Sequence, residues 1–152
     1  MSYTTAEGRE QILGDLAVAI DQIAESLAAL GEAYEQLDEQ TADVLEEQLF
    51  RPVQHAYGLA RRTHSEFAAR SGLNSRTFHP HTPGAQSQSV QDLIERGVDG
   101  AYDADQSIAE LQDSMLPVEV GDTELRAGLS SVRELLSSVP IRARALTRTV
   151  GR

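Results

Sequence analysis

The feature that most constrains this chain is a seven-residue repeat of apolar side chains between residues 13 and 37. Apolar residues recur there at alternating steps of three and four, at Leu13, Leu16, Ile20, Ile23, Leu27, Leu30, Tyr34 and Leu37. This pattern is typical of a long helix whose a and d positions form a seam against partner helices. An apolar seam of this length is not stable in water, so the rest of the chain must provide helices that cover it.

Two later segments carry the same repeat. It recurs at Val90, Ile94, Gly97, Ala101, Ala104, Ile108, Leu111 and Met115, and again at Leu125, Leu129, Val132, Leu136, Val139, Ala143, Leu146 and Val150. A fourth, less regular apolar face contains Pro52, and Pro140 interrupts the last repeat in the same way. Proline inside a helix removes a backbone hydrogen bond and kinks the helix. The sequence therefore predicts an all-α, antiparallel four-helix bundle with two proline-kinked helices.

The expected boundaries follow from caps and breakers. We expect a single helical-bundle domain over residues 1–152, with helices at about 4–37, 41–71, 89–116 and 122–150. Residues 38–41 contain neither glycine nor proline, so a continuous helix is one alternative there. A tight turn is the other, because Asp38 and Thr41 are both good N-caps and a break would give four helices of similar length. We favour the turn.

The longest connection is expected at residues 73–88. Pro80, Pro83 and Gly84 exclude regular structure there, and the small polar residues around them indicate exposure to solvent. A connection of this length can cross the end of a bundle or travel along its side. By contrast, Pro117 should end the third helix, and residues 118–121 should form a short turn into an antiparallel fourth helix capped by Asp122.

Charge alternates along the chain. Residues 1–50, 51–80, 81–125 and 126–152 carry net charges of −11, +4, −9 and +5, which sum to −11. Alternating segments favour antiparallel neighbours of opposite charge. The overall negative charge argues against nucleic-acid binding, and no apolar run is long enough to span a membrane. We expect a cytoplasmic protein that binds neither nucleic acid nor membranes.

Motifs for cofactor, metal or catalytic chemistry are not found. A di-iron bundle needs Glu-x-x-His on two helices, and none of the four histidines follows a glutamate at that spacing. His79 and His81 are weak candidates for metal ligands, because a site needs three or four and no third is marked. The chain has no cysteine, no nucleophile elbow and no phosphate-binding glycine loop. We expect no cofactor, no metal and no enzymatic activity.

Small residues in the third helix form the first candidate site. Gly97, Gly100, Ala101 and Ala104 lie on or beside its seam, where other helices carry large residues. An aromatic side chain from a facing helix, such as that of Tyr34, Tyr57, Phe50 or Phe67, could fill the space. Otherwise the space, bordered by Tyr34 and Tyr57, is a cavity for a small apolar ligand or a groove for a partner helix. We favour the filled space.

Arginines near the end of the second helix form the second candidate site. The cluster consists of Arg61, Arg62, Arg70 and Arg76. These side chains can offset the dipole at a helix C-terminus and face acidic helices, or they can contact an acidic partner. With no catalytic motif, the sequence favours a non-catalytic bundle that acts through a protein partner or by self-association. The alternative is a bundle that binds a small apolar ligand in the middle of its third helix.

Overall fold

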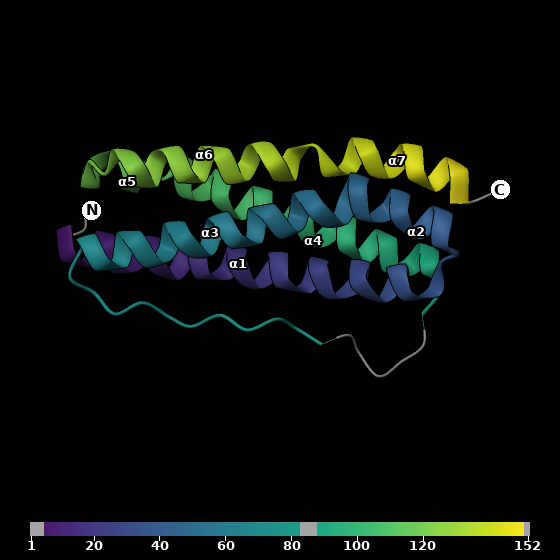
Figure 1. The fold of residues 1–152 in the computed structure, drawn as a ribbon. Coiled ribbons are helices and arrows are strands. Elements are labelled where there is room, and N and C mark those ends of the chain that lie inside the picture. Colours follow the sequence, from purple (N-terminus) through teal and green to yellow (C-terminus); the bar gives the residue numbers. More distant parts are fainter. Residues whose placement is uncertain (1–4, 83–87, 151–152) are drawn as a thin grey trace.

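The computed structural model describes residues 5–82 and 88–150 of the chain (Figure 1). Within those ranges every regular element is helical, which confirms the all-α prediction. The elements are α1 (Thr5–Gln36), α2 (Glu39–Leu45), the π-helical turn η1 (Glu46–Phe50), α3 (Arg51–Arg70), α4 (Val90–Asp113), α5 (Leu116–Val120), α6 (Thr123–Ser137) and α7 (Val139–Val150).

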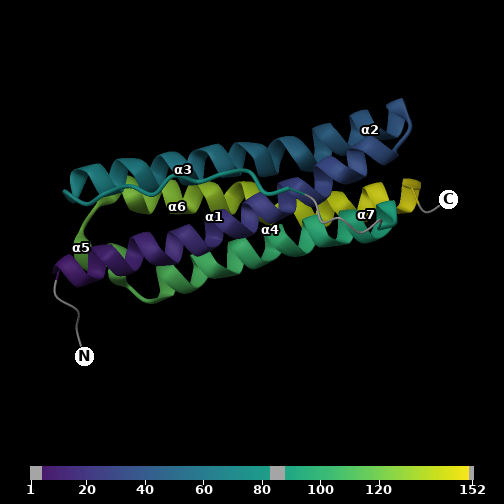
Figure 2. The same ribbon diagram turned by 90° about the horizontal axis from the view of Figure 1, so that it is seen from below.

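The helices form an elongated bundle in which neighbours run in opposite directions. α1 packs against α4 and α3, and α6 packs against the same two helices from the other side (Figures 1 and 2). α2, η1 and α3 follow one another without a break, and α7 continues the direction of α6. The connection after α3 runs back along the bundle, so α4 starts at the far end and runs parallel to α3 (Figure 2).

The break between the first two helices is set by an aspartate cap. α1 ends at Gln36, and Asp38 accepts a 2.7 Å hydrogen bond from the backbone N–H of Thr41. The hydrogen bonds from Thr41 hold the pKa of Asp38 below its ordinary value. Because Asp38 is the cap, α2 begins at Glu39, two residues earlier than predicted. Ser89 caps α4 in the expected way and accepts from the N–H of Asp92 at 3.1 Å.

Pro52 and Pro140 both lie beside residues that depart from the regular α-helical hydrogen-bond pattern. Before Pro52 the chain forms the wider π turn, in which Arg51 donates its N–H to the carbonyl of Glu46. Because Pro52 has no backbone N–H, the N–H of the preceding residue, Arg51, makes the hydrogen bond at this point of the helix. Near Pro140 the α-helical pattern is interrupted at Ser138, whose hydroxyl donates to the carbonyl of Leu135 at 2.9 Å.

The connection between α4 and α6 differs from the prediction. α4 ends at Asp113, before Pro117, and Met115 adopts a left-handed backbone with φ of 68°. Pro117 does not end a helix but lies in the first turn of α5, where the lack of an N–H costs nothing. Gly121, with φ of 75°, ends α5, and Asp122 caps α6 by accepting from the N–H of Leu125 at 2.9 Å.

The core contains most of the three predicted seams. In α1, Leu16, Ile20, Ile23 and Leu30 are fully buried, but Leu27 is half-buried and Tyr34 is exposed; Leu37, just after the helix, is half-buried. A straight α-helix rotates by about 20° per heptad relative to a strict 3.5-residue repeat. The late positions of the seam therefore turn away from the core, and Leu27 faces a groove rather than the bundle interior.

Two pairs of helices approach each other closely at glycines. An ideal Cβ at Gly97 of α4 would lie 2.5 Å from Leu30 Cδ2 of α1, and one at Gly100 would lie 3.1 Å from Ser26 Cβ. Between α6 and α3, a Cβ at Gly128 would lie 2.5 Å from Thr63 Oγ1. Any side chain at these positions would overlap the facing helix, so glycine sets the separation in both pairs.

We predict opposite effects for two glycine-to-alanine changes. Gly97→Ala should lower the free energy of unfolding by about 1–3 kcal/mol, because Leu30 must move. Gly14→Ala, in α1 with no atom near the added methyl, should raise it by up to about 1 kcal/mol through helix propensity. Chemical denaturation measures both. Equal effects of the two changes would contradict close packing at Gly97.

Candidate functional site

Side chains of α1 lie against the small residues of α4, where the sequence favoured filling by an aromatic ring and left a cavity as the alternative. The atoms nearest to Gly97 and Gly100 belong to Leu30, Ser26 and Gln22 rather than to an aromatic ring. Ser26 also donates a buried 2.5 Å hydrogen bond to the carbonyl of Gly97. Ala101 and Ala104 are fully buried in the core. The small residues therefore allow α1 and α4 to pack closely.

The two tyrosines assigned to that cavity lie elsewhere. Tyr34 is exposed near the end of α1, and Tyr57 is buried on α3. Arg61 of the predicted arginine cluster lies over the ring of Tyr57, with its guanidinium carbon 5.0 Å from the ring centroid. Arg62 is exposed.

Arg70 and Arg76, the other two arginines of the predicted cluster, form salt bridges with acidic residues of the same chain. Arg70 makes a two-pronged salt bridge with Asp122, at 2.8 and 2.9 Å, and a third hydrogen bond of 3.0 Å with Glu124. The hydrogen bond from Arg70 holds the pKa of Asp122 below its ordinary value. Arg76 pairs with Asp21 of α1 at 3.1 Å. These two arginines join basic segments to acidic ones, so the four do not form one free surface for a partner.

The connection after α3 is largely exposed, as its composition predicts, and it travels along the side of the bundle, but one of its side chains, Phe78, is buried. α3 ends at Arg70, Gly72 has φ of 69°, and Leu73 donates its N–H to the carbonyl of Ala68 at 2.9 Å. Residues 73–82, here called the strap, then run along the α1–α3 side of the bundle (Figure 2). The ring of Phe78 is buried edge-to-face against His64, with 5.0 Å between centroids.

Beyond Phe78 the same side of the bundle contains an open apolar groove of about 630 Å³. This α1–α3 groove is lined by Ala24, Leu27, Ala28, Gly31, Glu32 and Glu35 of α1, by Phe50, Gln54, Tyr57, Gly58 and Arg61 of η1 and α3, and by Pro80 and His81 of the strap. The two glycines keep it open: a Cβ at Gly58 would meet no atom within 4 Å, and one at Gly31 would meet only Phe50, at 3.9 Å.

Two polar atoms on this side of α3 are buried and have no hydrogen-bond partner in the described part of the chain. They are the hydroxyl of Tyr57 and Nδ1 of His64. Burial lowers the pKa of His64, a hydrogen bond with the backbone of Leu13 opposes that shift, and the charge of Arg76 adds to it. His55, on the same helix, is exposed, whereas His64 is buried.

No metal site forms at the predicted histidines. His79 is exposed and His81 is half-buried at the groove. Across residues 5–82 and 88–150, no group of three or more histidine or acidic side chains is arranged to hold a metal ion. In the same ranges no helix combines the length and apolarity that crossing a membrane requires.

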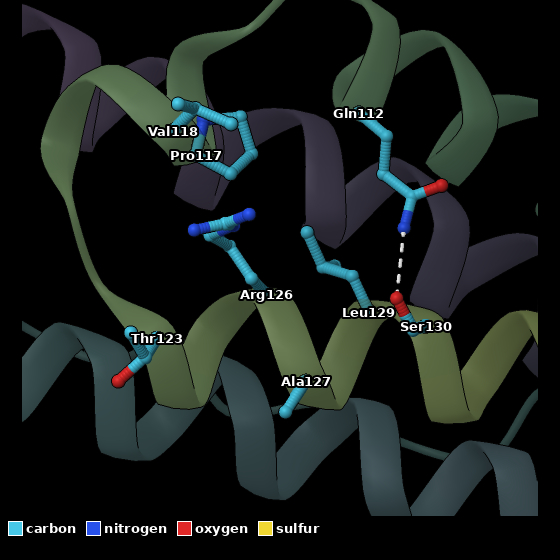
Figure 3. Close-up of a pocket in the computed structure, with 8 residues that line it drawn as sticks. All are labelled: Gln112, Pro117, Val118, Thr123, Arg126, Ala127, Leu129 and Ser130. Atoms are coloured by element: carbon cyan, nitrogen blue, oxygen red, sulfur yellow. Dashed lines mark hydrogen bonds between the residues drawn. The ribbon is translucent and has the colours of Figure 1, made fainter.

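Other hollows lack these features. One of about 430 Å³ lies between α4, α5 and α6, where Arg126 points from α6 toward Pro117 and Val118 and Gln112 donates to Ser130 at 3.4 Å (Figure 3). Another, of about 750 Å³, lies between α4 and α7 and is rimmed by arginines. Neither of these two hollows is lined by Tyr57 or His64, the residues whose buried polar atoms lack a hydrogen-bond partner in the described part of the chain. The α1–α3 groove is therefore the candidate site.

No protein-family model, curated protein or solved structure matches this chain. Its function has to be argued from its own geometry.

We predict that Phe78 anchors the strap. Phe78→Ala should speed tryptic cleavage after Arg76 by a factor of about 5–30, which corresponds to about 1–2 kcal/mol of anchoring. Thr77→Ala, at an exposed position of the strap, is the control and should leave the rate unchanged. Mass spectrometry of the fragments over time measures both rates. Equal cleavage of the two variants would mean that the strap is not held by Phe78.

His64 should make stability depend on pH. Its folded-state pKa is lowered, so its neutral form stabilises the fold fully above the ordinary value of 6.5. This contribution is lost as the pH falls through 6.5 toward the folded-state pKa, because the unfolded chain then binds the proton more readily. The difference in unfolding free energy between the wild type and His64→Gln should therefore shrink on acidification from about pH 7.5 to about pH 5.5.

His55→Gln removes an exposed histidine from the same helix and is the matched control. Denaturant melts of the three proteins across this range measure the effect. If His64→Gln and the wild type lose stability in parallel, then burial of His64 does not govern the acid response.

Proposed function

We propose that this protein is a non-catalytic interaction protein that binds an extended segment of a partner protein in the α1–α3 groove. One observation carries the proposal: the open groove adjoins the part of the α1–α3 side in which the strap of this chain already lies. The strap is an extended segment with a buried aromatic anchor, so this side of the bundle already holds a polypeptide of that form. In the open part, α1 and α3 are available to bind a second segment.

The composition of the groove supports binding of a polypeptide. Its floor is apolar, with the half-buried Leu27 and Phe50 available for contact, and its rim is polar. An apolar centre with a polar rim is the usual anatomy of a protein interface, and a few buried anchors carry most of the binding energy. The groove thus suits a short segment with one or two large side chains.

The buried polar side chains support a non-catalytic role. Ser26 donates to a backbone carbonyl, Thr63 donates to the carbonyl of Leu59 at 2.8 Å, and Asp105 pairs with Arg133 at 2.7 Å. His64 stacks against Phe78. In the described chain these groups serve packing, and none pairs a nucleophile with a base as covalent catalysis requires.

A small apolar ligand is the second candidate for the same groove. Its volume falls in the range of about 300–1,000 Å³ typical of ligand pockets. Tyr57, one of the residues that line the groove, favours this candidate because its ring could contact a small apolar ligand. A thermal-shift screen of small apolar compounds separates the two candidates, because a ligand specific to the folded state raises the melting temperature.

The test uses Gly58→Leu to fill the groove. A leucine there enters open space, so the variant should fold as well as the wild type, and Gly14→Leu is a matched control on an exposed face. Peptides selected from a displayed random library against the wild-type chain should bind Gly14→Leu equally. They should bind Gly58→Leu at least about tenfold more weakly.

Three results would contradict the proposal. The first is a library that yields no binding peptide. The second is a set of selected peptides whose affinity does not change in Gly58→Leu. The third is a dimer in light scattering that Gly58→Leu dissociates, because the groove would then be occupied by a second copy of this chain.

A further inference from the structure

We infer that the partner segment carries a cationic side chain and an aromatic side chain, the two kinds of group that the strap presents with Arg76 and Phe78. The inference rests on the function proposed above and adds the chemistry of the occupant. Its basis is that the open part of the α1–α3 groove repeats the groups that hold the strap.

The filled part of this side of the bundle holds the strap with two kinds of group. Asp21 of α1 pairs with Arg76 at 3.1 Å, and His64 of α3 meets the ring of Phe78 edge-on at 5.0 Å. Arg76 also lies 5.0 Å over the ring of Phe78. The seat therefore consists of an acid on α1 and a flat ring on α3, bound by a cation and an aromatic ring on the strap.

The same two kinds of group recur farther along the same faces. Glu32 comes eleven residues after Asp21 on α1, which places it about 20° from the same face and about 16 Å farther along the helix. Tyr57 comes seven residues before His64 on α3, about two turns away on the same face. Because α1 and α3 are antiparallel, both steps lead toward the same end of the bundle (Figure 2). Glu32 and Tyr57 both line the open groove.

The open part has more negative charge on α1 and more space than the filled part. Glu35 adds a second acid to the α1 rim, while Ala28 and Gly31 leave space below it. On the other wall, Arg61 already lies over the ring of Tyr57. A cation of the occupant is therefore directed to the α1 rim, and its aromatic side chain to the floor between the helices.

The next residues of the chain itself do not supply this chemistry. Residues 83–89 have the sequence PGAQSQS, which contains neither a basic nor an aromatic residue. We therefore assign the open part to a segment of another protein, and occupation by a second copy of this chain is the outcome that light scattering would reveal.

The probe is a capped, fluorescent ten-residue peptide with the sequence of residues 73–82, LNSRTFHPHT, added to the full chain. Fluorescence anisotropy should show saturable binding. Replacing either the arginine or the phenylalanine of the peptide by alanine should weaken binding at least about tenfold. These comparisons use one unchanged protein, so a folding defect cannot explain them.

Protein variants locate the binding site. Gly58→Leu should abolish binding of the probe. Glu32→Gln combined with Glu35→Gln should weaken binding of the parent peptide but not weaken further the peptide that lacks arginine. Asp103→Asn combined with Glu110→Gln, two exposed acids on α4, is the matched control and should have no effect. Binding of the parent peptide should weaken with added salt.

Several results would overturn the inference. These are no binding at millimolar peptide, equal binding of the parent and alanine peptides, or binding that is insensitive to Gly58→Leu and stronger in Phe78→Ala. The last result would mean that the peptide only displaces the strap. If library peptides without a cation and an aromatic residue still lose affinity in Gly58→Leu, the proposed function stands and only this inference fails.

Discussion

Steric contact at glycines determines which helices of this protein touch closely and which remain apart. At Gly97 and Gly128 the facing helix lies where a Cβ would be, so α1 with α4 and α3 with α6 form tightly packed pairs. At Gly58 no atom lies within 4 Å of an added Cβ, and at Gly31 such a Cβ would make only an ordinary contact with Phe50, at 3.9 Å. The same residue type therefore brings two helices together at one interface and leaves a groove at another. The candidate site exists because these glycines are not covered.

The strap connects this packing to function. It runs from the end of α3 along the α1–α3 side (Figure 2), and its Phe78 side chain is buried. His64 meets this ring edge-on, and burial lowers the pKa of His64. The strap is thus part of a connection between helices and also fills part of the α1–α3 side of the bundle. The contacts of the strap show which kinds of side chain this side of the bundle binds.

The helical class of this protein could be derived from sequence because it depends on local, periodic information. Three heptad repeats require helices that cover one another, and side-chain caps such as Asp38, Ser89 and Asp122 specify where helices begin. The alternation of charge also indicated which segments attract each other, as the pairing of Arg70 with Asp122 illustrates. Each such exposed pair contributes only about 0–1 kcal/mol, so charge selects among arrangements that burial stabilises.

The site was decided only in three dimensions, because it depends on how the helices are rotated about their axes. Sequence could identify the small residues at Gly97 and Gly100 but not whether Leu30 or a ligand would lie against them. It placed Leu27 in the core, yet the drift of a 3.6-residue helix against a 3.5-residue repeat turns that side chain toward the groove. Likewise, the composition of the strap correctly indicated an exposed linker but not that Phe78 within it would be buried, with its ring edge-on to His64. The sequence by itself determined that this chain forms covered helices, whereas tertiary packing determined which of their faces remained open.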